Sequence, residues 1–114
     1  MSSLVSSPLG AVVNAPPQGF KFGAPVSGTH WDGSDYGSDY VGVEFFSEAG
    51  GLLIDASLVL SDNSMQINGF AKHTDDVWDY HNGAFIENVL DNPDETRDVI
   101  NKLAADLLNN YPGL

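Results

Sequence analysis

Residues 40–72 read YVGVEFFSEAGGLLIDASLVLSDNSMQINGFAK, and the pattern of apolar residues in this segment predicts a β-sheet. Apolar residues alternate along 40–46, 52–60 and 65–72, which is the two-residue period of half-buried strands. Gly50 and Gly51 lie at the first turn, and residues 61–64 form the second. Short turns join antiparallel neighbours, so we predict an antiparallel meander of three strands, with a fourth short strand near 77–80. In the third strand we expect Ile67 and Phe70 to be buried.

The C-terminal stretch predicts an amphipathic helix. Asn92 is the expected N-cap, Pro93 is the first helical residue, and Glu95 lies at the capping-box position. Apolar residues at helical spacing then form one stripe, comprising Val99, Ile100, Leu103, Ala104, Leu107 and Leu108. A shorter helix is predicted over 84–90. The fold class is therefore α+β, a small antiparallel β-meander of three to four strands packed by a C-terminal amphipathic helix.

The first thirty residues are rich in Pro, Gly and Ser and show no apolar periodicity. Each of the four prolines removes a backbone donor and restricts the residue before it. We predict an extended or flexible N-terminal arm over 1–30 and a single small α+β domain over 31–114. Because the arm also contains several large apolar residues, the alternative to a flexible tail is an arm that orders against a partner.

The charge balance is strongly acidic. Sixteen Asp and Glu residues face four Lys and Arg residues among 114, which gives a formal net charge of −12. This argues against direct binding to nucleic acid or to an anionic membrane, because phosphate contacts need basic side chains. It is compatible with a basic protein partner, with bound cations or with mimicry of nucleic-acid charge, and most simply it keeps the protein soluble.

Several site and location classes are excluded or disfavoured by composition. The chain has no cysteine, which excludes disulfides, thiolate metal sites and a cysteine nucleophile. No apolar run reaches the ~20 residues of a membrane span. The first basic residue is Lys21, so no conventional signal peptide is recognisable. We expect a soluble protein, cytoplasmic or associated with a particle.

Two acidic segments are candidate metal sites. His73, Asp75, Asp76, Asp79 and His81 fall within nine residues, and Asp79 and His81 would share one face of a strand over 77–81. Histidine and carboxylate ligands suit zinc and other transition metals, although no established spacing is matched. The residues favour the simpler interpretation, a solvated loop whose Asp side chains cap turns.

The second segment, with Asp32, Asp35 and Asp39, could hold a weak calcium ion, although the EF-hand pattern is absent. It overlaps a tandem Gly-Ser-Asp-Tyr at 33–36 and 37–40. Five aromatic residues lie beside acids and are candidate partner-binding residues, namely Trp31, Tyr36, Tyr40, Trp78 and Tyr80. Such rings suit sugars or protein interfaces, and they are equally common at the edge of a core.

No catalytic frame is recognisable. The chain lacks a nucleophile-elbow glycine pattern, a phosphate loop and a dinucleotide fingerprint, so we expect no enzyme and no cofactor apart from weak calcium. The leading hypothesis is a non-catalytic interaction or assembly protein with a protein partner, for instance a small component of a viral particle or of another multisubunit complex. One alternative is an acidic inhibitor or nucleic-acid mimic that binds a basic partner. The other is a calcium- or carbohydrate-dependent binding module.

Overall fold

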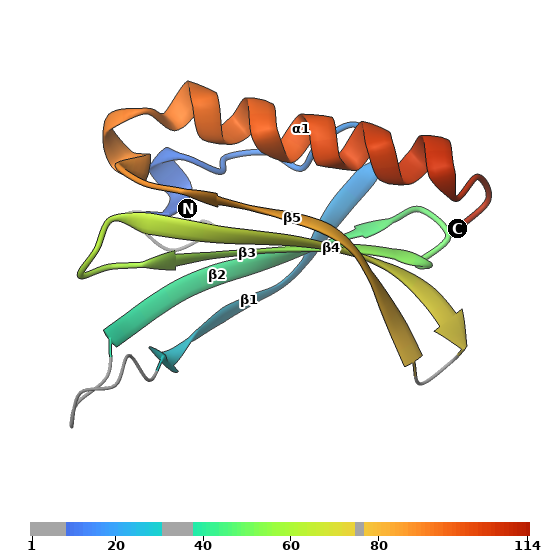
Figure 1. The fold of residues 1–114 in the computed structure, drawn as a ribbon, viewed down its shortest axis with the longest axis horizontal. Helices are drawn as coiled ribbons and strands as arrows, with labels where there is room; N and C mark the ends of the chain where they lie inside the picture. Colours follow the sequence, from blue (N-terminus) through green and yellow to red (C-terminus); the bar gives the residue numbers. More distant parts are fainter. Residues whose placement is uncertain (1–8, 31–37, 75–76) are drawn as a thin grey trace, which may run out of the picture.

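The computed structural model describes residues 9–30, 38–74 and 77–114, to which the structural statements below refer. The elements are two short 3₁₀ turns, five strands and one helix (Figure 1). They are η1 (Leu9–Ala11), β1 (Phe20–His30), β2 (Ser38–Ser47), β3 (Leu52–Val59), β4 (Ser64–Thr74), β5 (Val77–Ile86), η2 (Val89–Asp91) and α1 (Pro93–Asn110). The strands form one antiparallel sheet in the sequential order β1-β2-β3-β4-β5. No helix in these ranges is long and apolar enough to cross a membrane.

The predicted α+β class and antiparallel meander are confirmed, with five strands rather than three to four. The additional first strand comes from the segment predicted as the arm. Phe20 pairs with Ser47 and His30 with Ser38, so residues 20–30 belong to the sheet. Pro25 lies where the pairing with β2 shifts, and an irregular edge strand is where a missing backbone donor is tolerated.

The predicted helix over 84–90 is wrong. Ala84, Phe85 and Ile86 continue β5 and pair with residues 65–67 of β4. The chain leaves the sheet after Ile86, and Asn88, whose φ of 55° is in the left-handed region, precedes the turn η2. Strand pairing thus overrides the helical spacing of these apolar residues.

Helix α1 packs on one face of the sheet and contacts β3, β4 and β5. Alternate residues of β3 form the centre of the core, and Leu52, Ile54, Ala56 and Leu58 are fully buried. From the predicted helical stripe Ile100, Leu103, Ala104 and Leu107 are buried, Val99 is half-buried, and Leu108 is exposed. The helix lies close to the sheet at Gly69, where an added Cβ would be 3.0 Å from the Leu103 side chain.

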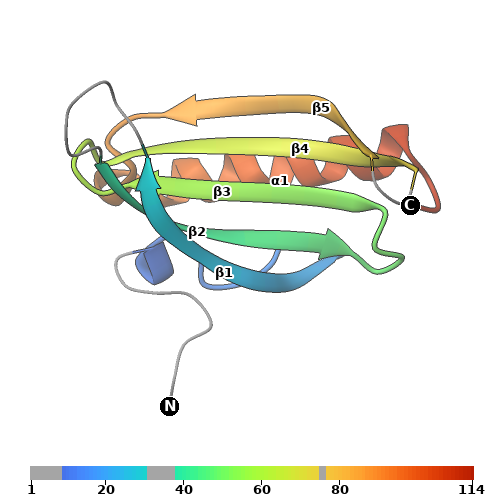
Figure 2. The same ribbon diagram turned by 90° about the horizontal axis from the view of Figure 1, so that it is seen from below.

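The segment before β1 completes the core on the same face. Leu9, Val12 and Val13 are buried, and the segment lies beside α1 on the β1–β2 side of the sheet (Figures 1 and 2). One guanidinium nitrogen of Arg97 donates to the Val12 carbonyl oxygen at 3.0 Å, which joins this segment to α1. The described part of the predicted arm is therefore a structural component of the domain.

The two ends of α1 are held by different contacts. The Asn92 side chain does not cap the helix; instead the Asn92 backbone N–H donates to the carbonyl oxygens of Asn88 and Val89 in the preceding turn. The predicted capping box is therefore not formed. Beyond the C-terminal end, the Leu114 carbonyl oxygen accepts hydrogen bonds from the Gly51 N–H at 2.7 Å and the Ser47 hydroxyl at 2.6 Å, which joins the tail to the β2–β3 turn.

We predict that Leu9→Ala lowers the free energy of unfolding by about 2–5 kcal/mol, because it removes a fully buried side chain and leaves a cavity. Urea denaturation measures the change. Leu60→Ala is the matched control, since Leu60 lies beyond β3 and is exposed; it should stay within about 0.5 kcal/mol of the parent protein. Equal stability of Leu9→Ala and the parent would mean that the N-terminal segment is not part of the core.

Candidate functional site

The sheet face opposite α1 is covered by no described element, and we call it the open face (Figure 2). The strand pairing aligns its side chains in rows across the sheet. The first, here the aromatic row, consists of Phe46, Leu53, Phe70 and Tyr80, one from each of β2 to β5. Phe70 and Tyr80 meet edge to face with ring centroids 5.8 Å apart, a favoured aromatic geometry.

Trp78 enlarges the aromatic row on its outer side. Its ring lies 6.4 Å from that of Phe46, and the Lys72 ammonium is 5.8 Å from its centroid, within the range of a cation–π contact. Phe46, Leu53, Phe70 and Trp78 are only half-buried, although they contact one another. The row is therefore an apolar strip that remains partly accessible to a partner.

The next row is polar and consists of Glu44, Asp55, Asn68 and Gly83. Glu44 and Asp55 lie directly opposite each other on β2 and β3, an arrangement of like charges that destabilises a sheet. Burial raises the pKa of Asp55, and a hydrogen bond from the Asn68 amide at 3.1 Å opposes this in part. Of the ion pairs identified in the described ranges, none involves either carboxylate.

The open face becomes most exposed toward β5. Tyr80 is 60% exposed and Phe85, which lies opposite Gln66, is 61% exposed. Gly83 lets the Tyr80 side chain lie along the strand, because a Cβ at that position would be 2.6 Å from the Tyr80 hydroxyl and 2.8 Å from the Ile67 carbonyl oxygen. The solvent-exposed surface of the aromatic side chains is thus concentrated at the β5 edge of the sheet.

Three of the five predicted partner-binding aromatics can be placed. Trp78 and Tyr80 lie together on the open face, and half-buried Tyr40 lies on the same face in β2, opposite Val59. Trp31 and Tyr36 lie outside the described residues. Sequence reasoning missed Phe46 and Phe85, and it predicted Phe70 in the core. Gly69 takes the core-facing place instead, since it is two residues from Ile67 in a strand.

The predicted metal-binding residues do not converge where they are described. His73 Nδ1 lies 3.3 Å from Asp79 Oδ2, and both side chains are exposed. His81 has different partners, Asp106 Oδ2 at 2.5 Å and the Tyr111 hydroxyl at 3.3 Å, which connect the bulge in β5 to α1 and to the residue that follows it. Within the described ranges no three His, Asp or Glu residues are grouped to hold a metal ion. Asp32, Asp35, Asp75 and Asp76 lie outside those ranges, and Asp39 is described only as a backbone member of β2.

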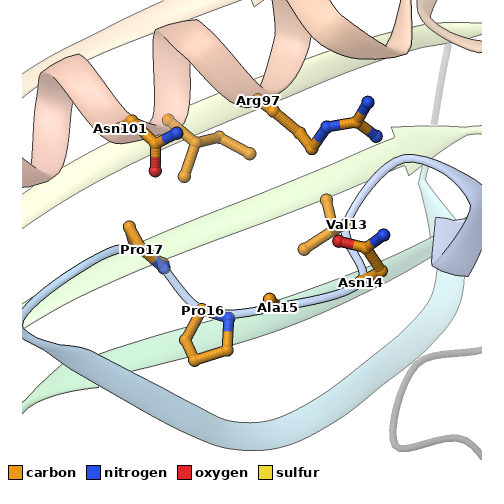
Figure 3. A pocket seen from close by; sticks show the side chains of 8 residues that line it. Val13, Asn14, Ala15, Pro16, Pro17, Arg97 and Asn101 are labelled. Atoms are coloured by element: carbon orange, nitrogen blue, oxygen red, sulfur yellow. The ribbon is translucent and has the colours of Figure 1, made fainter.

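A small pocket of about 130 Å³ lies between the N-terminal segment and α1 (Figure 3). Its lining consists of Val13, Asn14, Ala15, Pro16, Pro17, Arg97, Ile100 and Asn101. Arg97 is the one charged lining residue, and its guanidinium is engaged by Val12 and by Asp94. We interpret the pocket as the seam between two packed segments rather than as a catalytic site.

No family model matches this sequence, and no curated protein or solved structure matches it either. The open face, with its aromatic row and its pair of carboxylates, is therefore the candidate functional site on physical grounds alone.

We predict that Asp55→Asn raises the free energy of unfolding at about pH 7 by about 0.2–1 kcal/mol, because it removes the like-charge pair with Glu44 and the cost of a half-buried carboxylate. The pKa of Asp55 is raised in the folded protein. The charged carboxylate therefore destabilises the fold fully at pH values above this raised pKa, and it no longer does so at pH values well below the ordinary pKa of an aspartate. The gain should therefore become smaller as the pH is lowered from about 7 to about 3.

Urea denaturation at the two pH values measures this difference. Glu87→Gln is the control, since it removes an exposed carboxylate just beyond β5. A gain of equal size at both pH values would show that charge is not its cause.

Proposed function

We propose that the protein is a non-catalytic interaction protein that binds a basic protein partner through the open face of its sheet. The observation that carries the proposal is the exposure of aromatic side chains on a face that no described element covers. Among the six large apolar side chains exposed in the described ranges, Phe85 and Tyr80 are the most exposed, and both lie on this face. Aromatic residues are enriched at the centres of protein interfaces.

Charge supports a basic partner. The carboxylates of Glu44 and Asp55 lie beside the aromatic row, and the chain as a whole carries a net charge of −12. A partner with Lys or Arg next to apolar side chains would complement both rows of the open face. Opposite charges would also accelerate the encounter of the two proteins at low salt.

The non-catalytic part of the proposal rests on the sequence, in which no catalytic frame is recognisable. Each of the two histidines with described side chains lies against a carboxylate, His73 against Asp79 and His81 against Asp106. His81 also lies 3.3 Å from the Tyr111 hydroxyl.

We predict that the double variant Tyr80→Ser, Phe85→Ser weakens partner binding about 30-fold or more, since it removes the two most exposed rings of the open face. The matched control Leu60→Ser, Leu90→Ser also removes two exposed apolar side chains, which lie outside the strands of the sheet, and should bind like the parent. A photoreactive residue placed at position 85, compared with position 60, would identify the partner. Titration calorimetry with that purified partner would then measure the affinities.

Circular dichroism is the check that both double variants keep the fold. Equal affinity of the two would exclude the open face as the binding surface. Affinity that depends on salt but not on Tyr80 and Phe85 would instead favour an acidic mimic, which binds by charge alone.

A further inference from the structure

We infer that the partner contributes an extended segment that pairs with β5 as a sixth strand of the sheet. The inference rests on the proposed function, because it specifies how the same partner docks. In the strand order β5 pairs with β4 and with no other described strand. Its free edge offers backbone N–H and C=O groups, and addition of a strand to such an edge is a recurrent mode of peptide binding.

The two edges of the sheet differ in how well they are protected. Lysine and proline commonly guard exposed edges against pairing, and β1 contains Lys21 and Pro25. Strand β5 contains neither residue type. It carries instead three of the exposed large apolar side chains, Val77, Tyr80 and Phe85. The β5 edge is therefore the better acceptor of a partner strand.

A groove beside β5 provides room for the side chains of an added strand. It has a volume of about 360 Å³ and lies between β5, at residues 82–84, and α1, where Val99, Leu103 and Asp106 line it. Successive side chains of a strand point to opposite faces. A strand beside β5 would thus direct one set into this groove and the other set toward Tyr80 and Phe85.

The bulge in β5 restricts where the added strand pairs. Pairing with β4 shifts between Tyr80 and Asn82, which leaves His81 without a partner residue on β4. Residues 82–86 are the regularly paired part of β5 that lies next to the groove. Within it, Asn82 Oδ1 accepts a hydrogen bond from the Gly83 N–H at 2.9 Å. An incoming strand that uses this amide has to displace the Asn82 side chain.

The chemistry around the edge favours a basic, apolar segment from another protein. Carboxylates of Asp79, Glu87 and Asp106 lie on or near β5, whereas Lys102 is the basic residue of the groove. A second copy of this chain would bring another −12 charge to the edge and is therefore disfavoured. The segment that fits alternates Val- or Leu-like residues with Lys or Arg.

An acetylated and amidated heptapeptide of alternating valine and arginine is a direct probe of this edge. In an amide NMR titration of the full chain, we expect saturable shifts at residues 82–86 and at the groove residues of α1. Hydrogen exchange of the amides at the β5 edge should slow at the same time. A peptide with proline in place of the central valine should bind at least about tenfold more weakly, because proline cannot extend the hydrogen-bond ladder.

Two variants test the groove from opposite walls. Ala84→Lys and Val99→Lys each place a cation where the peptide's apolar side chains would lie, and each should weaken binding of the heptapeptide at least about tenfold. Leu60→Lys, at an exposed site away from the groove, should not. An unchanged circular dichroism spectrum shows that a variant is folded. If one of the two variants fails to fold, the other still tests the groove.

Absence of saturable shifts, or shifts on the central strands without protection at 82–86, would overturn strand addition. Neither result would contradict the proposed function, because that proposal is tested by the effect of Tyr80 and Phe85 on binding of the partner itself. Conversely, peptide pairing at β5 with no effect of those two rings on the partner would overturn the open-face proposal alone.

Discussion

A single α-helix is too narrow to cover five strands, and the arrangement of the chain follows from this mismatch. A helix with its side chains is about 10 Å wide, whereas five strands spaced about 4.8 Å apart span about 19 Å. Helix α1 lies over β3 to β5, and Leu9, Val12 and Val13 complete the core on the β1–β2 side. Gly69 lets α1 approach closely, and Arg97 joins it to the N-terminal segment.

In the described part of the chain, helix α1 and the N-terminal segment cover the same face of the sheet, so the side chains of the open face contact mainly one another there. In the middle of the sheet this is sufficient to bury them halfway, since Phe46 contacts Trp78 and Phe70 contacts Tyr80. At β5 the sheet ends, and Tyr80 and Phe85 have strand neighbours on one side only. The exposure of the candidate binding residues is thus a consequence of their position at an edge rather than of an unusual local conformation.

Much of this fold could be predicted from the sequence, including a strand near 77–80, but strand β1 and the second part of β5 could not. The alternation in 52–60 identified β3, although Leu60 is exposed beyond its end, and the stripe from Val99 to Leu107 identified α1. Strand β1 was not predicted because Gly23, Ala24 and Pro25 interrupt the alternation of apolar and polar residues. The end of β5 was predicted as a helix because Phe85, Ile86 and Val89 also match helical spacing. Short apolar runs are ambiguous in this way.

For the binding surface, residue types were predictable and their neighbours were not. Trp78 and Tyr80 could be singled out, but their grouping with Phe46 and Phe70 depends on strand register and on the bulge at His81. Likewise Glu44 and Asp55 are eleven positions apart in sequence and become opposite neighbours only through pairing of β2 with β3. Burial, which raises the pKa of Asp55, and the like charge on the opposite residue are both unfavourable in the free protein. A basic side chain placed between them would pair with both carboxylates and offset their like charges, so the proposed partner would stabilise the fold through the same carboxylates that attract it.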